Sequence, residues 1–423
     1  MARTSFQITL LLVFSVAFMT GALGDDKKST RPGGHWDAPR KDMPRILTPQ
    51  QREDMERLSA LGYLDATEEA QTDQVVTIHD PKKTFDGVNL YVSGHNAEAL
   101  LVDMNGALLH RWTYDPETHG KALLDEPHDP RWHMFHVYPN GDLIVLQHHE
   151  GLLKLDKDSK MLWARTPGSV HHDMDVMDSG ELFVLTRSPE MMDWISDEKP
   201  IVNDTITELS AEGEVVRVVS ILECIRNAGE EELLAELIGN VVRDYGDILH
   251  TNSIEIMDGR LAQTMPAFKR GRILLSIRHP NAIMLLDLEE EKLVWWHRGE
   301  FKNQHDASIL SNGNLLIFDN NQHGKKSAIR ELDVATGAER WVYWGSEEKP
   351  FYAFQSGRCQ RLPNGNTLIV ESTFGRVFEV TPEKEIVWEF WNPKRAGENN
   401  DFIARIYECV RYPQDYFGDW LAK

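Results

Sequence analysis

The chain has 423 residues, and 41% of them are hydrophobic, so it is long enough to build packed sheets around a sizeable core. Its formal net charge of −22 excludes nucleic acid and an anionic membrane surface as expected partners, because phosphate binding needs a concentrated basic face. The sequence also lacks a P-loop, a G-x-G-x-x-G run after a strand, a G-x-S-x-G elbow and a C-x-x-C pair.

The chain begins with a segment typical of exported proteins. Arg3 is followed by an apolar run from Ile8 to Leu23, and Ala22-Leu23-Gly24 forms a small-x-small cleavage pattern. This predicts a secretory signal peptide over residues 1–24 and a periplasmic or secreted protein. An uncleaved membrane anchor is the alternative, because the run approaches the roughly 18 apolar residues of a spanning helix.

Residues 25–80 are polar and punctuated by proline, which predicts a linker. One amphipathic helix is expected within it, from Thr48 to Leu64, with Thr48 as its cap.

Two kinds of hairpin alternate from residue 81 to the end of the chain. The outer kind occurs six times, with turns at Asp103, Asp156, Ser210, Asp287, Asp333 and Thr381. The inner kind has turns at Gly141, Gly180, Gly259 to Gly271, Gly313 and Gly365. Serial hairpins of this period predict an all-β fold, a six-bladed β-propeller with four-stranded antiparallel blades over residues 81–423.

The sixth inner hairpin is expected to join the two ends of the domain. Phe402 to Pro413 would be the innermost strand, paired with Gly87 to Ser93, which removes exposed sheet edges. The last strand would then direct Arg405 or Tyr407 toward the central channel.

Residues 221–247 form the one long insertion, with helical spacing of Ile225, Leu233, Leu237 and Val241. This helical insertion should lie over the channel mouth, where it would act as a lid that excludes water. Simple packing over a hydrophobic blade edge is the alternative. Cys359 and Cys409 fall on neighbouring inner strands, so a disulfide between them and a pair of buried free thiols both stay open.

Histidine and arginine recur at one end of the inner hairpins. His133, His172 and His305 lie eight residues before a turn glycine, and His250 lies nine before one. Arg187, Arg278 and Asn320 lie seven residues after a turn glycine.

Converging imidazole and guanidinium groups suit the transfer of an anionic group such as sulfuryl or phosphoryl, because imidazole acts as a nucleophile or a general acid and base near neutral pH. The predicted catalytic residues are His172, His250, Arg278 and His305. The residues expected to bind substrate are His133, Arg187, Asn320 and Arg405. No cofactor is expected, and His279 should face away from Arg278.

A metal site is a second hypothesis, with His171, His172, Asp173, His305 and Asp306 as its candidate ligands. Strand alternation would turn each aspartate away from the preceding histidine, which favours a blade-to-blade role for them. The predicted site therefore contains no metal. A metal-dependent ester or lactone hydrolase and a non-catalytic binding propeller remain the alternatives.

Several runs of the sequence resemble the arylsulfate sulfotransferase family, six-bladed propeller enzymes of the bacterial periplasm. They are HTNSIEIMDG from His250, GRILLSIRHPNAIMLLDLEEEKLVWWHRGE from Gly271, QHDASILSNGNLLIFDNN from Gln304 and the opening GVNLYVSGHNAEALLVDMNGALLHRW from Gly87. The likeness extends from about Thr84 to Trp391.

The resemblance implies that the protein moves a sulfuryl group from an aryl sulfate donor to a phenolic acceptor without a nucleotide donor. It also implies that His305 is transiently sulfated while His172, His250 and Arg278 hold the sulfuryl oxygens. The expected partners are small molecules, with no stable membrane insertion after signal cleavage. A homodimer stays open.

Overall fold

The computed structural model of the protein describes residues 68–114, 131–239, 246–321, 324–396 and 402–421. The predicted signal peptide and the helix from Thr48 to Leu64 lie outside these ranges. Among the described residues, no helix is long and apolar enough to cross a membrane.

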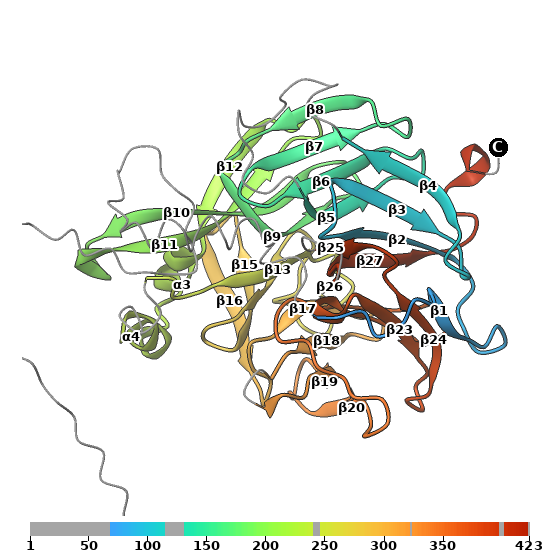
Figure 1. Ribbon diagram of the computed structural model, residues 1–423. Coiled ribbons are helices and arrows are strands. Elements are labelled where there is room, and N and C mark those ends of the chain that lie inside the picture. Colours follow the sequence, from blue (N-terminus) through green and yellow to red (C-terminus); the bar gives the residue numbers. More distant parts are fainter. Residues whose placement is uncertain (1–67, 115–130, 240–245, 322–323, 397–401, 422–423) are drawn as a thin grey trace, which may run out of the picture. The chain divides into compact units, whose positions relative to one another are not determined.

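Six antiparallel sheets form the blades of a propeller, which confirms the predicted fold (Figure 1). In the first blade the strands follow from the axis outward as β27 (Ile406–Tyr412), β2 (Val88–Ser93), β3 (Glu98–Val102) and β4 (Leu108–Thr113). The second blade consists of β5 (Trp132–Val137), β6 (Leu143–Gln147), β7 (Gly151–Leu155) and β8 (Met161–Arg165). The third blade consists of β9 (Ser169–Val176), β10 (Leu182–Met192), β11 (Ser196–Leu209) and β12 (Val215–Ser220).

The other three blades follow in the same way around the ring. They are β13 (Thr251–Ile256), β14 (Ile273–Ile277), β15 (Ala282–Asp287) and β16 (Lys292–Arg298); β17 (His305–Ile309), β18 (Asn314–Asp319), β19 (Ala328–Asp333) and β20 (Glu339–Tyr343); and β21 (Arg358–Arg361), β22 (Thr367–Glu371), β23 (Arg376–Val380) and β24 (Ile386–Trp391). A short pair, β25 (Arg395–Ala396) and β26 (Phe402–Ile403), precedes β27.

The innermost strands form a closed circle. Each contacts the next in the order β5, β9, β13, β17, β21, β27 and back to β5. The blade that closes this circle joins the two ends of the domain, as predicted, because Leu90 of β2 pairs with Val410 of β27. The inner strands thus bring residues far apart in sequence to one axis.

The turns explain the repeated residues of the hairpins. In the outer turn after β3, the Asp103 carboxylate accepts hydrogen bonds from the backbone N–H groups of Asn105 and Ala107, both at 2.8 Å. In the inner turn after β5, Gly141 has a φ of 87°, a left-handed conformation that favours glycine. Both turn types depend on residues close together in the sequence, and both recur in successive blades.

The tryptophans that close the outer hairpins connect neighbouring blades. Trp112 donates its indole N–H to the carbonyl of Gly141 in the next blade at 2.9 Å, and Trp388 donates to the carbonyl of Met104 at 2.8 Å. Both indoles are fully buried, so each wedge also removes a large apolar surface from water.

The sixth blade carries a fifth strand. β1 (Val76–His79) pairs with β24 on the outer edge of the sheet. The prediction assigned these residues to the linker of residues 25–80, because that segment is polar and punctuated by proline. In the structure they cover an otherwise open strand edge.

The insertion forms α3 (Ile221–Ala228) and α4 (Glu231–Gly239). Ser220 caps α3 by accepting a hydrogen bond from the N–H of Glu223, and Gly229 ends it at a φ of 74°.

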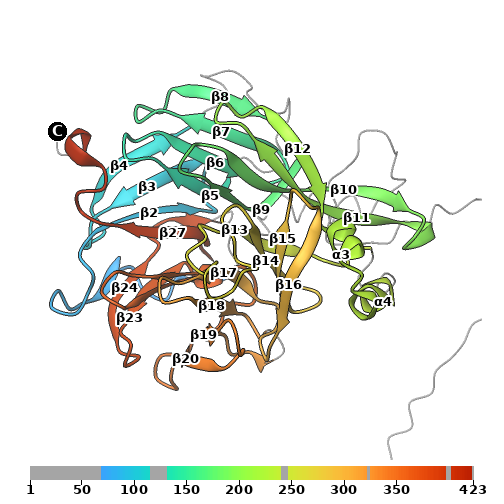
Figure 2. The same cartoon turned by 180° about the vertical axis from the view of Figure 1, so that it is seen from behind.

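The helices do not cover the channel mouth, so the lid is not observed for them, and the alternative of packing over a blade edge is confirmed. α3 packs against the outer strands β16, β12 and β11, and the buried residues of both helices join the core between the third and fourth blades. Figures 1 and 2 show both helices at the rim, beside an extended β10–β11 hairpin. The apolar stripe of an amphipathic insertion is satisfied equally well by a blade edge, which is why its spacing alone did not locate it.

The three cysteines are free and buried. Cys359 packs in the core beside Phe351 and Phe378, whereas Cys409 packs in another core beside Tyr91. The structure therefore favours the second of the two alternatives, buried thiols rather than a disulfide.

Candidate active site

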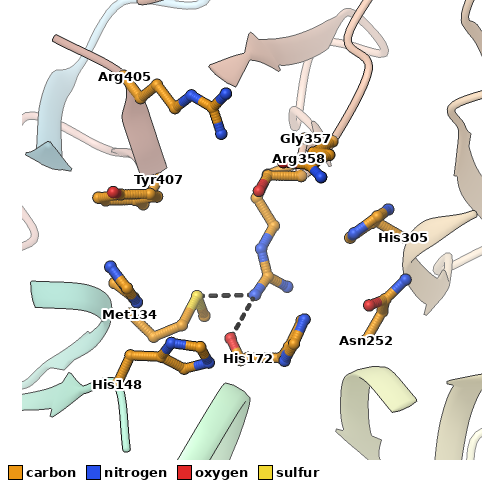
Figure 3. A pocket seen from close by; sticks show the side chains of 12 residues that line it. Met134, His148, His172, Asn252, His305, Gly357, Arg358, Arg405 and Tyr407 are labelled. Atoms are coloured by element: carbon orange, nitrogen blue, oxygen red, sulfur yellow. Dashed lines mark hydrogen bonds between the residues drawn. The ribbon is translucent and has the colours of Figure 1, made fainter. Parts of the chain in front are cut away.

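All six innermost strands, with the loops beside them, contribute to one cavity of about 190 Å³ on the propeller axis (Figure 3). Its lining residues are His133, Met134, His148, His172, Asn252, His305, Gln355, Ser356, Gly357, Arg358, Arg405 and Tyr407. These lining residues include two arginines and four histidines but no carboxylate. The described wall is therefore rich in hydrogen-bond donors for an anion.

Irregular backbone aims several of these side chains. The pairing of the inner strands shifts register beside His133, His172, Thr251 and His305, as a β-bulge does. His172 and His250 adopt φ values of 56° and 54°, a left-handed conformation that costs roughly 1–2 kcal/mol for a residue with a side chain. The strict two-residue alternation of a strand therefore fails at the histidines.

His305 presents one defined ring nitrogen to the cavity. Its Nδ1 lies 2.6 Å from the Asn320 side-chain oxygen and 3.2 Å from the carbonyl oxygen of Asn303. Both neighbours are acceptors, so Nδ1 carries the proton and Nε2 keeps its lone pair.

Asn320 itself is held in one orientation. Its amide nitrogen donates to the carbonyl oxygens of Ala353 at 2.9 Å and Ser356 at 2.7 Å, which leaves its oxygen for His305. Burial, with the charges of Arg278 and Arg358, lowers the pKa of His305 to about 3. The imidazole is therefore neutral at physiological pH.

His250 forms a pair with a buried carboxylate. Its Nδ1 lies 2.6 Å from Asp247 Oδ2, so it donates to that oxygen. Burial lowers the pKa of His250 although Asp247 opposes that shift. Burial acts to raise the pKa of Asp247, but His250 and His279 outweigh it and hold that pKa well below its ordinary value.

His279 lies in the same cluster, contrary to the prediction that it faces away. Its ring centroid is 5.1 Å from that of His250, and its Nε2 is 2.7 Å from an Arg278 nitrogen. His279 Nδ1 contacts the carbonyl oxygen of Asp247, so Nε2 accepts from the guanidinium. The prediction failed because both residues follow the end of β14, where strand alternation no longer applies.

His172 is backed by another histidine. His171 Nδ1 is 2.9 Å from His172 Nδ1, and His171 Nε2 is 3.7 Å from a carboxylate oxygen of Asp204. Burial lowers the pKa of His172 far below its ordinary value, and the neighbouring His171 and His250 lower it further. The ring centroids of His172 and His250 are 5.1 Å apart, so these two predicted residues meet.

The predicted site residues divide into two groups. His133, His172, His305 and Arg405 line the cavity. Asn320 and His250 touch lining residues, whereas Arg278 contacts His279. Arg187 lies further back and contacts His149 Nε2 at 3.2 Å.

Arg358 lies at the centre of the cavity and was missed by the sequence reasoning (Figure 3). Its guanidinium is 3.0 Å from both Asp173 and Asp306 and 3.3 Å from Glu408. Burial raises the pKa of Glu408 to about 8 despite Arg358, so this carboxyl is largely protonated at neutral pH. Residue 358 holds the position directly after the repeat's histidine position, as Asp173 and Asp306 do, and that equivalence was the available signal.

Asp173 and Asp306 have the predicted blade-to-blade role. Asp173 accepts a hydrogen bond from the N–H of Ile254 at 3.0 Å, and Asp306 accepts from the N–H of Cys359. They are thus engaged with neighbouring blades and Arg358 rather than grouped with the histidines as a ligand set.

A different trio among the described residues has metal-ligand geometry. Ligand atoms of Asp247, His250 and His279 lie within 4.8 Å of one another. The Arg278 guanidinium beside His279 would repel a cation there, and the Asp247–His250 hydrogen bond would have to break. This set fits a metal poorly.

Comparison with known proteins gives one family. The family model for arylsulfotransferase (ASST) matches residues 136–393. Similar solved structures include a protein of unknown function from Bacteroides caccae, with 11% identity, a TM-score of 0.49, and coverage of 77% of this chain and 99% of that chain. Another is the virginiamycin B lyase from Staphylococcus aureus, with 13% identity, a TM-score of 0.37, and coverage of 66% and 83%. No match was found among curated proteins.

Proposed function

The chain belongs to the arylsulfotransferase family, and we propose that it is an exported enzyme that moves a sulfuryl group between phenols through a sulfated His305. A sulfotransferase activity follows from the family, whereas the ping-pong route is the proposal. The observation that carries it is the tautomer of His305: a neutral imidazole whose Nδ1 is held by Asn320, with Nε2 left for the cavity. Nucleophilic catalysis needs such a lone pair.

In the first half-reaction, the Nε2 lone pair of His305 attacks the sulfur of an aryl sulfate. The N–S bond forms as the bond from sulfur to the phenolic oxygen breaks, and the phenolate leaves with the electron pair. The positive charge that develops on the ring is stabilised at Nδ1–H, which donates to Asn320.

In the second half-reaction, a phenol acceptor attacks the same sulfur. Its proton passes to Nε2 of His250, whose Nδ1–H donates to Asp247. The N–S bond breaks and its electrons return to His305. The protonated His250 then gives its proton to the phenolate that leaves in the next cycle, so protons balance over the two half-reactions.

His172 and Arg278 are proposed to hold the sulfuryl oxygens, as the family resemblance implies. His172 lines the cavity and is close to His250. Arg278 acts on His305 through its charge, since it helps to lower the pKa of that histidine. Hydrogen-bond donors that approach from several directions suit the three equatorial oxygens of a sulfuryl group in the transition state of its transfer.

Export through the segment of residues 1–24 and assembly as a homodimer remain proposals. The family is consistent with small-molecule donors and acceptors.

The test is intact-mass spectrometry of the protein after brief exposure to 4-nitrophenyl sulfate, with nitrophenol release followed in parallel. We expect a mass gain of one SO₃ that maps to His305, and release that depends on an added phenol after the first turnover. Release without an adduct, abolished by a chelator and accompanied by bound metal, would instead support the metal-dependent hydrolase. If the protein forms no adduct and releases no nitrophenol, the result would support a non-catalytic binding propeller.

Asn320 provides a sharper prediction, because it positions the nucleophile. Asn320→Asp places a carboxylate beside Nδ1 of His305 and should raise the pKa of that imidazole above its value of about 3. The acidic limb of the kcat profile should therefore move to higher pH, and activity at mildly acidic pH should fall by about tenfold per unit of that displacement.

Asn320→Leu is the matched comparison, since it removes the oxygen and adds no charge. It should lower kcat by roughly 10- to 100-fold, and the acidic limb should not move to higher pH, because the hydrogen bond that it removes is one that raises the pKa of His305. An unchanged limb in Asn320→Asp, measured beside Asn320→Leu, would contradict the positioning role.

A further inference from the structure

Arg405 is a buried arginine without a counterion among the described residues. Only 7% of its surface is exposed, and its Nε has no hydrogen-bond partner within the described part of the chain. Arg405 does form a hydrogen bond through its backbone, because its carbonyl oxygen accepts from the N–H of Gly94 at 2.9 Å.

Other buried arginines of the described chain show what this position lacks. Four of them bind a carboxylate: Arg272 with Asp287, Arg330 with Asp319, Arg376 with Glu389 and Arg411 with Glu379. The fifth, Arg187, contacts His149 Nε2 at 3.2 Å, and the nearly buried Arg358 binds Asp173. A guanidinium taken out of water without a partner is costly, since its hydration is lost and nothing replaces it. Arg405 therefore needs an anion that the described fold does not supply.

The arginine lies where a ligand can reach it. Arg405 lines the cavity, and Figure 3 shows it beside Tyr407, across the cavity from His305 and Asn252. The charge of Arg358 is already matched by carboxylates, so Arg405 offers the unmatched positive charge on this side.

The wall below Arg405 is aromatic and apolar. The ring centroids of Tyr407 and His133 are 4.1 Å apart, and Met134 lies next to them in the lining. The cavity of about 190 Å³ is small beside the roughly 300–1,000 Å³ of pockets for drug-sized ligands, so it suits one substituted aromatic ring.

We propose that this side of the cavity binds a carboxylate carried on the aromatic ring of the substrate. The ring would rest against Tyr407 and Met134, its carboxylate would accept from the Arg405 guanidinium, and its phenolic oxygen would face His305. Hydroxybenzoates and their sulfate esters are the substrate class that this arrangement selects. A planar carboxylate matches the guanidinium fork with two parallel hydrogen bonds. This inference rests on the proposed sulfuryl transfer for its catalytic meaning, but not for its binding test.

The experiment compares 4-hydroxybenzoate with its neutral methyl ester. Calorimetric titration should give the carboxylate an affinity roughly 10- to 100-fold higher than the ester for the wild-type protein, the range of a buried charge-assisted hydrogen bond. In Arg405→Met this ratio should fall to about one while the affinity for the ester stays the same. Arg340→Met, which removes an exposed arginine from β20, should keep the wild-type ratio.

Inorganic sulfate is titrated in parallel, because a bare oxyanion could occupy the same guanidinium. If the affinity for sulfate falls in Arg405→Met while the ratio of carboxylate to ester does not, Arg405 serves the sulfuryl group and the proposal fails. Equal affinities of ester and carboxylate for the wild type, or a ratio that survives Arg405→Met, would also overturn it. Should Arg405→Met not fold, Arg405→Lys keeps the charge without the fork and should lower the ratio by several-fold.

The binding titration separates this inference from the proposed function. If nitrophenyl sulfate gives no adduct while the carboxylate still binds through Arg405, the site is right and the chemistry is wrong. If transfer occurs and KM does not distinguish acid from ester, the chemistry is right and the carboxylate site is wrong.

Discussion

Replacing His305 with asparagine is expected to abolish sulfuryl transfer. The variant loses the one imidazole whose Nδ1 is held by Asn320 and whose Nε2 is left for the cavity. Loss of a covalent nucleophile costs roughly a thousandfold or more in kcat. Nitrophenol release should fall to the level of the uncatalysed reaction, and no SO₃ adduct should form.

The matched control is His297→Asn. His297 lies on β16, the outermost strand of its blade, and does not line the cavity. It should release nitrophenol at the wild-type rate. An adduct that persists in His305→Asn would place the nucleophile elsewhere, and His250 would then be the next histidine to replace.

Ending the chain at Arg405, so that β27 is absent, is expected to prevent folding. The strand buries Ile406 and Cys409, and Arg411 is fully enclosed with Glu379. Burial of each large apolar side chain contributes about 1.5–3 kcal/mol, and leaving a buried carboxylate without its cation costs about 3–5 kcal/mol. The sum exceeds much of the roughly 5–15 kcal/mol by which a native domain is stable.

The strand also joins two blades. The Gln360 side chain donates to the carbonyl of Arg411 at 3.1 Å and accepts from its N–H at 2.9 Å. A chain that ends at Pro413 keeps this strand and loses Phe417, so it should fold with a lower melting temperature. Circular dichroism and thermal unfolding of both truncated chains test whether β27 is needed for folding. Cooperative unfolding of the chain that ends at Arg405 would show that ring closure by β27 is dispensable.

The blades were predictable because their determinants are local. An aspartate that accepts N–H groups two and four residues later, as Asp103 does, forms the outer turn wherever it recurs. A glycine with positive φ, such as Gly141, does the same for the inner turn. Ring closure followed from a count of hairpins, because an unpaired inner strand had to find a partner.

Orientation at the site was predictable only in part. The contacts predicted for Asp173 and Asp306 with neighbouring blades are observed, although the pairing shifts register beside both residues. Strand alternation failed for His279, which follows the end of a strand, and it did not anticipate the left-handed residues His172 and His250.

The sequence by itself determined the six blades, the strand that closes them and the histidines at one end of the channel, because each depends on a short pattern repeated along the chain. Only the tertiary structure decided the neighbours of those histidines. Arg358 is held by carboxylates from three other blades, and Arg405 has no carboxylate among the described residues. Asn320 meets Nδ1 of His305 within one blade, beside a strand whose pairing shifts register. The charge and tautomer of a buried group depend on such contacts, since in a low dielectric the nearest partners dominate its energy, and no spacing along the chain encodes them.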